Sequence, residues 1–246
     1  MKFLYYIYQL FIVLPIVLVL TILTALTTII GSLLGSKSFW GYYPGMLWSR
    51  AVCLVCLLPV KVYGKENIQK GQSYVIIPNH QSIIDTFLIY GFIGIRFKWM
   101  IKKEIEKVPF VGFACKMCGH IFIDRASRKD AAGGMTAAKN ALVNGMSVTI
   151  FPEGTRTKDG SLGRFKKGAF ALAEELHLPL LPVTINGARN VMPKGRWFLQ
   201  CHKMSITIHQ PIHPKGMPQD DAQTRGEHMT ASIAESAAAI ESALIK

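Results

Sequence analysis

The first feature that limits the possible folds is an uncharged stretch, residues 3–36, near the N-terminus. A helix needs roughly 20 apolar residues to cross a bilayer, so this stretch is long enough. It is also too long for the apolar core of a signal peptide, and no small-residue cleavage site precedes a polar segment. Pro15 and several threonines are tolerated in membrane helices. The sequence therefore predicts a membrane-associated helix before any soluble domain.

The charged residues around this stretch predict its orientation in the membrane. Lys2 alone precedes it, whereas Lys37, Arg50 and Lys61 follow it. The positive-inside rule then places the remainder of the chain on the cytoplasmic side. A second apolar segment, 46–60, is short and contains Arg50, so it could be a buried helix, an interfacial helix or the return limb of a re-entrant pair.

From Lys61 onward, short apolar runs rich in β-branched residues alternate with segments typical of helices. This pattern predicts an α/β domain with a mixed, largely parallel sheet flanked by helices. We expect two parts, a membrane-associated helical segment (1–60) and an α/β domain (61–246). The expected strands are 74–78, 97–101, 120–123, 147–151, 180–185 and 204–210, and the expected helices are 82–93, 108–118, 129–144, 167–175 and 221–245.

The composition narrows the class of partner. With 28 basic and 15 acidic residues the formal charge is +13, which suits nucleic acid, an acidic membrane surface or phosphorylated small molecules. No basic run interleaved with aromatics supports nucleic acid. The five cysteines include two Cys-x-x-Cys pairs, Cys53/Cys56 in an apolar run and Cys115/Cys118 followed by His120, and buried thiols are favoured over a zinc site.

The stretch Asn79–Asp85 combines a histidine with a carboxylate at a predicted strand–turn–helix corner. Five residues on a helix turn through roughly 500°, so His80 and Asp85 cannot share a helical face. They can meet if His80 lies in the turn and Asp85 in the first turn of the helix. Ser82 and Asp85 have the spacing of a capping box, which would begin the helix there. The pattern indicates a general base with an orienting carboxylate. No G-x-S-x-G sequence accompanies it, which disfavours a serine hydrolase.

Three further clusters follow apolar runs, where ligand sites of α/β sheets collect. Asp124-Arg125 ends the run Gly119–Ile123 and could bind phosphate or form a surface ion pair. Phe151-Pro152-Glu153-Gly154-Thr155-Arg156, with basic residues downstream, could bind phosphates or be a solvated charged loop. The third cluster, 178–183, contains two prolines and by itself indicates only a structural role, in which the prolines shape the entry of a strand.

Taken together and in this order, these four clusters resemble the four motif blocks of the glycerolipid acyltransferase family. The similarity is strongest to the bacterial 1-acyl-glycerol-3-phosphate acyltransferases and covers roughly residues 61–212. The resemblance implies acyl transfer from acyl-CoA or acyl carrier protein to the sn-2 hydroxyl of lysophosphatidic acid, giving phosphatidic acid. It also implies location at the inner (cytoplasmic) membrane, in contact with its lipids.

The resemblance further implies roles for individual residues. His80 would act as general base and Asp85 would orient its ring. Arg125, Glu153, Gly154, Thr155 and Arg156 would bind the glycerol phosphate, and the prolines of the fourth block would contribute to donor binding. No metal, redox cofactor or nucleic acid is expected. The alternatives are an acyltransferase with another lysophospholipid acceptor, a thioesterase, or a non-catalytic membrane lipid-binding protein.

Overall fold

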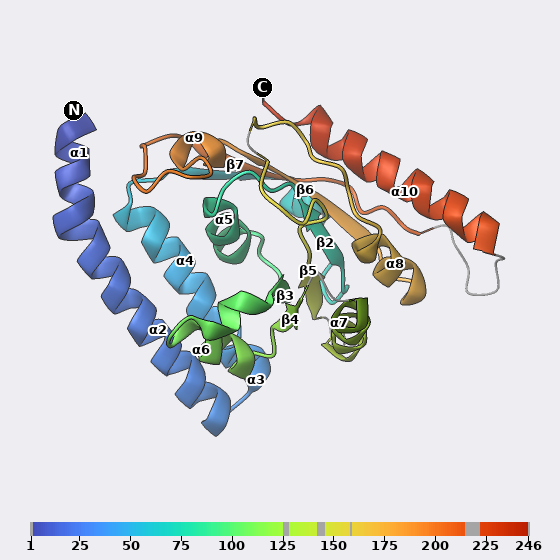
Figure 1. Cartoon of the computed structure of the whole chain (residues 1–246), viewed down its shortest axis with the longest axis horizontal. Coiled ribbons are helices and arrows are strands. Elements are labelled where there is room, and N and C mark those ends of the chain that lie inside the picture. Colours follow the sequence, from blue (N-terminus) through green and yellow to red (C-terminus); the bar gives the residue numbers. More distant parts are fainter. Residues whose placement is uncertain (1, 125–127, 142–145, 158, 215–221, 246) are drawn as a thin grey trace.

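The fold consists of one sheet between two layers of helices, with a long helix along one side (Figure 1). The computed structural model describes all residues except 1, 125–127, 142–145, 158, 215–221 and 246. The sheet has the order β1-β7-β6-β2-β5-β3-β4 and is parallel except between β6 and β7. Its strands are β1 (Val60–Tyr63), β2 (Val75–Pro78), β3 (Phe97–Lys102), β4 (Ile121–Ile123), β5 (Ser147–Thr149), β6 (Leu180–Asn186) and β7 (Met204–Ile208).

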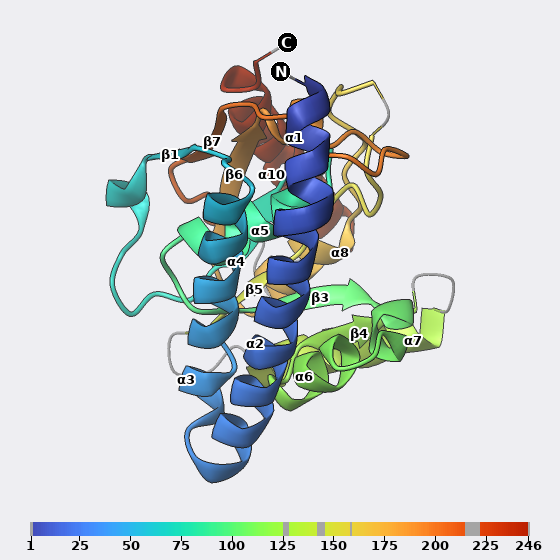
Figure 2. The same cartoon turned by 90° about the vertical axis from the view of Figure 1, so that its left-hand side faces the viewer.

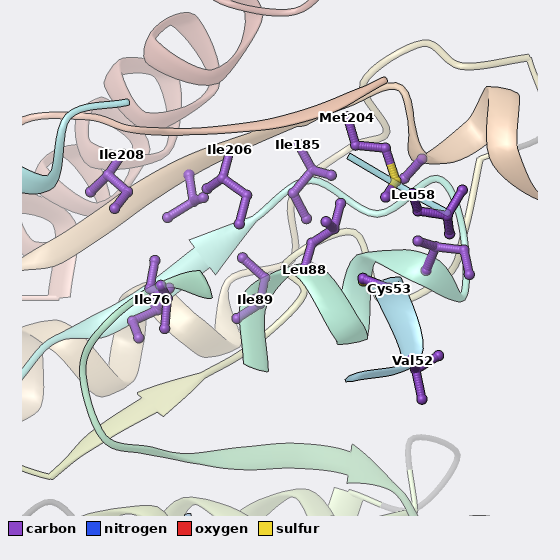
Figure 3. Close-up of a cluster of buried hydrophobic side chains, with 14 of the residues drawn as sticks. Val52, Cys53, Leu58, Ile76, Leu88, Ile89, Ile185, Met204, Ile206 and Ile208 are labelled. Atoms are coloured by element: carbon purple, nitrogen blue, oxygen red, sulfur yellow. The ribbon is translucent and has the colours of Figure 1, made fainter. Parts of the chain in front are cut away.

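Alternating side chains of the central strands build two separate cores. Ile76 points into the core that also contains Leu88 and Ile206, whereas its neighbour Val75 points into the core on the opposite face. Figure 3 shows the first core, formed with side chains of α4 and α5. The helices are α3 (Lys37–Trp40), α4 (Tyr43–Val55), α5 (Ile84–Phe92), α6 (Val111–Met117), α7 (Arg128–Ala141), α8 (Gly168–Glu175), α9 (Ala188–Val191) and α10 (Ala222–Ser242). Helices α7, α8 and α10 cover the second face.

The uncharged N-terminal stretch forms one long helix, as predicted. It comprises α1 (Lys2–Tyr8), a π-helical segment (Gln9–Val13) and α2 (Leu14–Leu34). The run Phe3–Leu34 is long and apolar enough to cross a membrane, and only 11% of its most apolar window is buried. An apolar helix left so exposed by its own protein needs another apolar environment. This helix is consistent with membrane association.

The second apolar segment returns along this helix. The Trp48 Nε1–H of α4 donates to Thr21 Oγ1 of α2 (3.1 Å). The hydroxyls of Tyr5 and Tyr8 donate to the carbonyl oxygens of Cys56 (2.6 Å) and Val55 (2.7 Å). Figure 2 shows α4 beside α2. Because the end of α4 meets the start of α1, the two segments form a helical hairpin, and buried residues of α4 also belong to the first core.

The predicted fold class is confirmed, with two differences in detail. The strand β1, which pairs with β7 in parallel, was not predicted, and β5 and β7 end two residues earlier than expected. β1 begins at Val60, next to the expected boundary, but α4 packs into the same core as the sheet. The division into a helical segment and an α/β domain therefore stays a prediction. The expected end of the helix at Asn144 lies outside the described residues.

Candidate active site

The corner between β2 and α5 brings the predicted histidine and aspartate together. His80 follows the carboxyl end of β2, and its Nδ1 lies 2.9 Å from Oδ2 of Asp85, in the first turn of α5. Asp85 is fully buried, whereas the His80 side chain retains 18% of its exposure. With Nδ1–H donated to the carboxylate, Nε2 is the nitrogen that can accept a proton. The predicted meeting of these two side chains is confirmed.

Oδ2 of Asp85 also organises the backbone of the turn. It accepts the backbone N–H groups of Gln81 (2.7 Å) and Ser82 (2.8 Å) in addition to the imidazole. The bond from Ser82 is one half of the predicted capping box. The other half differs, because Ser82 Oγ accepts the N–H of Ile84 (3.1 Å) and the helix begins at that residue. One carboxylate oxygen thus fixes both the turn and the orientation of His80.

Two residues that the sequence analysis did not single out hold His80 from other sides. The Asn79 side chain donates to the carbonyl oxygen of Ile185 (3.1 Å) and accepts its N–H (2.7 Å), which ties the end of β2 to β6. The ring of Phe151 stacks on the imidazole with a centroid separation of 3.9 Å and an interplanar angle of 15°. Both residues flank predicted motif residues, which was the signal available in the sequence.

Glu153 connects the third motif block to the first. Its Oε1 accepts the backbone N–H of His80 (2.7 Å), and its Oε2 accepts that of Gly163 (2.9 Å). The Thr157 N–H donates to the His80 carbonyl oxygen (3.1 Å), so both backbone groups of His80 are held by this block. The sequence analysis assigned Glu153 to substrate binding, but this carboxylate is buried and occupied by backbone donors.

The burial of Glu153 also changes its acidity. Desolvation raises its pKa from 4.5 to about 7, although the N–H groups of His80 and Gly163 favour the ionised form. The negative charge of Asp85 raises the pKa further.

This shift predicts a dependence of stability on pH. Because the folded-state pKa of Glu153 lies above its unfolded value, its contribution is fully present below about pH 4.5 and is lost as the pH rises through about 7. The loss is up to about 3 kcal/mol in the free energy of unfolding. Glu153→Gln should remove this pH dependence, whereas Glu66→Gln, at an exposed glutamate, should retain it. Equal pH profiles of chemical unfolding for wild type and Glu153→Gln would contradict the assignment.

A cationic pocket opens beside the third block. We call it the third-block pocket; its volume is about 640 Å³ and it is lined by Glu153, Thr155, Thr157, Gly163, Arg164, Phe165, Lys166 and Lys167. Lys166 also crosses over Gly154, where an added Cβ would lie 2.9 Å from Nζ. Gly154 has φ of +74°, so glycine is favoured there on two grounds. The predicted basic cluster thus gathers at one hollow that can attract a phosphate.

The remaining predicted binding residues lie near this pocket or outside the described part of the chain. Thr155 is exposed and lines it, and Arg156 is half-buried next to it in the sequence. Arg125 lies outside the described residues. Of the Asp124-Arg125 pair in the second block, the structure describes Asp124, which lies directly after β4.

Two more hollows are lined by residues that neighbour His80. One, of about 250 Å³, is mainly apolar and is lined by Phe151, Pro152, Met100, Ile123, Met135, Ile150, Gly154, Lys166, Gly168 and Ala169. Phe151 separates it from the imidazole that stacks on this ring. The other, of about 850 Å³, lies beyond β6, where Gln81, Lys61, Arg189 and Lys203 contribute to its lining. His80 is therefore in contact with one lining residue of the apolar hollow, Phe151, and next in the sequence to one of the larger hollow, Gln81.

Two other histidines, His120 and His209, have structural roles. Buried His120 accepts the N–H of Trp99 at Nδ1 (3.2 Å), and its burial lowers its pKa to about 3. His209 Nε2 pairs with the Thr184 hydroxyl (2.8 Å). Within the described ranges, no group of three or more His, Cys, Asp or Glu is placed to hold a metal ion.

The sequence and the fold of this chain are similar to those of known acyltransferases. Residues 59–186, which contain all four motif blocks, match the model of the acyltransferase family. The 1-acyl-sn-glycerol-3-phosphate acyltransferase of Saccharomyces cerevisiae is 31% identical over 224 residues, or 89% of this chain and 73% of the relative. The chloroplastic 1-acyl-sn-glycerol-3-phosphate acyltransferase LPAT1 of Arabidopsis thaliana is 32% identical over 174 residues, or 70% of this chain.

The similarity extends to a solved structure but not to the full length of every relative. The crystal structure of the 1-acyl-sn-glycerophosphate (LPA) acyltransferase PlsC from Thermotoga maritima superposes with a TM-score of 0.78 at 26% identity, covering 100% of this chain and 99% of the other. The chain spans about half the length of the chloroplast relatives, 48% and 50%. By its sequence match, its fold and its motif blocks, this chain belongs to the acyltransferase family.

Proposed function

We propose that the chain transfers an acyl group from an acyl thioester to the free sn-2 hydroxyl of 1-acyl-glycerol-3-phosphate, giving phosphatidic acid. The observation that carries this proposal is the His80–Asp85 pair, 2.9 Å apart, beside a cationic pocket. The yeast and Thermotoga relatives are named for the same reaction. A lysophospholipid with a larger head group is the second candidate acceptor.

The geometry supplies a direct route for the reaction. Nε2 of His80 removes the proton from the sn-2 hydroxyl while this oxygen attacks the thioester carbonyl. Asp85 stabilises the imidazolium that forms, as the acid of a hydrolase triad does. When the tetrahedral intermediate collapses, the C–S bond breaks and the thiolate takes the proton from His80. The substrate oxygen is the nucleophile, and no metal or redox cofactor enters these steps.

The tetrahedral intermediate needs hydrogen-bond donors for its oxyanion. Within the third block, the N–H groups of Gly154 and Thr157 already donate to the carbonyl oxygens of Phe151 and His80. We assign the role to the next N–H groups available on this turn, those of Thr155 and Arg156. Gly154, with φ of +74°, forms the turn that precedes these two N–H groups.

We propose places for the two substrates in these hollows. The acceptor phosphate binds at the third-block pocket with Thr155, Arg156 and the three cations of that pocket; we include Arg125 as a further phosphate ligand. Glu153 and Gly154 shape this site rather than touch the phosphate. The larger hollow beyond β6 has room for the phosphorylated carrier of acyl-CoA or acyl carrier protein. The apolar cavity behind Phe151 accepts part of an acyl chain.

The apolar helix supports a membrane location for the enzyme. We infer that it embeds the chain in the inner (cytoplasmic) membrane, with the catalytic domain facing the cytoplasm, because Lys37, Arg50 and Lys61 follow the helix. Both proposed lipids are anionic amphiphiles of such a membrane, and the net charge of +13 favours that surface.

Arg156→Ala tests the proposed acceptor. Losing a charged hydrogen-bond donor to phosphate should raise the apparent KM for 1-acyl-glycerol-3-phosphate roughly 10- to 100-fold, with a smaller change in kcat. The assay compares this acceptor with lysophospholipids that carry larger head groups, and Lys70→Ala serves as a control at an exposed lysine. An unchanged KM would refute the phosphate role of Arg156, and faster turnover of a larger head group would favour the second candidate.

A further inference from the structure

The connection between α9 and β7 has the composition of a lipid-contacting segment. We call residues 192–203 the α9–β7 loop. Its Trp197 is 90% exposed and Phe198 48% exposed. Lys194 and Arg196 flank them, and the loop contains no Asp or Glu. Exposed tryptophan beside cations is costly in water but favourable at the boundary between lipid headgroups and acyl chains.

This loop is fastened to the start of the membrane helix. The buried side chain of Gln9 donates from Nε2 to the carbonyl oxygen of Leu199 (2.9 Å) and accepts its N–H at Oε1 (2.8 Å). Tyr6 packs against Phe198, with ring centroids 5.1 Å apart. In Figure 2 the orange loop lies beside α1. Any membrane surface that α1 reaches is therefore within reach of the loop.

The helix deviates from regular geometry at this attachment. Gln9 is the first residue of the π-helical segment, which inserts an extra residue into the turn. A polar side chain in an otherwise apolar helix is costly unless it is hydrogen-bonded. Here both polar atoms of the amide are used by one backbone residue of the loop. The polar residue and the helix irregularity thus share one explanation, the attachment of this loop.

The same loop reaches the catalytic blocks. The Ser82 hydroxyl donates to the Met192 carbonyl oxygen (2.7 Å), and Lys194 Nζ donates to that of Arg156 (3.4 Å). The ends of the loop are joined by the bond from Gln200 N–H to the Val191 carbonyl oxygen (2.8 Å). The loop is therefore a closed unit that joins the membrane helix to the first and third motif blocks.

We infer that the α9–β7 loop is a second lipid-binding element, separate from the apolar helix. Trp197 and Phe198 enter the headgroup boundary, and Lys194 and Arg196 bind the phosphates of anionic lipids. Through Met192 and Lys194 the loop fixes the distance between the bilayer surface and His80. The role of this distance rests on the proposed function, because it concerns delivery of a lipid acceptor. Lipid contact by the loop is independent of the proposed function.

Tryptophan fluorescence of the full chain tests the lipid contact directly. The protein is reconstituted in vesicles of phosphatidylcholine and phosphatidylglycerol, with or without bromine on the acyl chains. Bromolipid quenching in the wild type should be reduced markedly in Trp197→Phe, a change that an exposed site tolerates. Trp99→Phe, at a buried tryptophan of β3, should keep the quenching. Equal quenching in wild type and Trp197→Phe would overturn the inference.

Turnover tests the consequence for delivery. Trp197→Ala and Gln9→Leu should each lower kcat/KM several-fold for a long-chain acceptor in vesicles, but leave kcat for a monomeric short-chain acceptor unchanged. Lys70→Ala, at an exposed lysine, should change neither. Equal losses on both acceptors would overturn the delivery role. If the wild type transfers no acyl group, the proposed function fails, and the fluorescence result still decides the lipid contact.

Discussion

His80→Ala is expected to lower kcat for acyl transfer roughly 10²- to 10⁴-fold, which is the contribution typical of a general base. The side chain can be removed with little effect on the fold, because the turn is held by the His80 backbone bonds to Glu153 and Thr157. Membrane association and the unfolding midpoint should therefore stay close to those of the wild type. The measurement is initial transfer rate at saturating donor and acceptor.

His213→Ala is the matched control, since it removes an exposed histidine far along the chain and should leave kcat unchanged. Wild-type rates in purified His80→Ala would refute the role of His80 as the base. Loss of the folded state in this variant would instead mean that the stacking of the imidazole on Phe151 is needed to stabilise the corner. The partial exposure of the His80 side chain indicates a smaller contribution.

Asp85→Asn is expected to have the second large effect, a decrease in kcat of roughly 10³- to 10⁴-fold. The neutral amide of asparagine has no charge to stabilise the imidazolium. Its NH₂ group is a donor, as Nδ1–H is, so it cannot hold the ring in the orientation that the carboxylate fixes. Its oxygen can still accept the N–H groups of Gln81 and Ser82, so the fold should be largely retained.

Asp85→Ala separates the two functions of this carboxylate. It leaves these buried N–H groups without their acceptor, which costs about 1–3 kcal/mol for each group. Chemical unfolding should therefore show a large loss of stability for the alanine variant and a small one for the asparagine variant, with activity lost in both. Activity of Asp85→Asn near that of the wild type would show that the carboxylate has only the structural function.

The strand–turn–helix corner could be predicted because its information is local. The spacing between His80 and Asp85, an apolar strand before them and a helix signal after them lie within about a dozen residues. The predicted strands and helices were likewise found because hydrophobic periodicity is a local property. The uncharged N-terminal stretch needed only its length.

The residues that support the corner depend on contacts between distant parts of the chain. Glu153 is 73 positions from His80 and Asn79 is 106 positions from Ile185, so neither partner could be read from spacing. The motif context of Glu153 suggested substrate binding, whereas its surroundings give it two backbone donors. The same reason explains why the attachment of Gln9 to Leu199 was not predicted.

The strand β1 and the direction of β7 were missed for another physical reason. β1 is a four-residue edge strand with half its side chains exposed, so it carries little hydrophobic signal. Whether β7 pairs antiparallel to β6 depends on how the intervening connection crosses the edge of the sheet. That connection includes the α9–β7 loop, whose course is set by Ser82 and Gln9 rather than by its own sequence.

The central claim is that this chain acylates lysophosphatidic acid with a histidine and no protein nucleophile. The most direct measurement gives the purified protein lysophosphatidic acid with labelled acyl-CoA or labelled acyl carrier protein, and follows the label. We expect phosphatidic acid labelled at the sn-2 position with at least one donor, and no label covalently bound to the protein. Release of free fatty acid without added lysophosphatidic acid, or no phosphatidic acid with either donor, would contradict it.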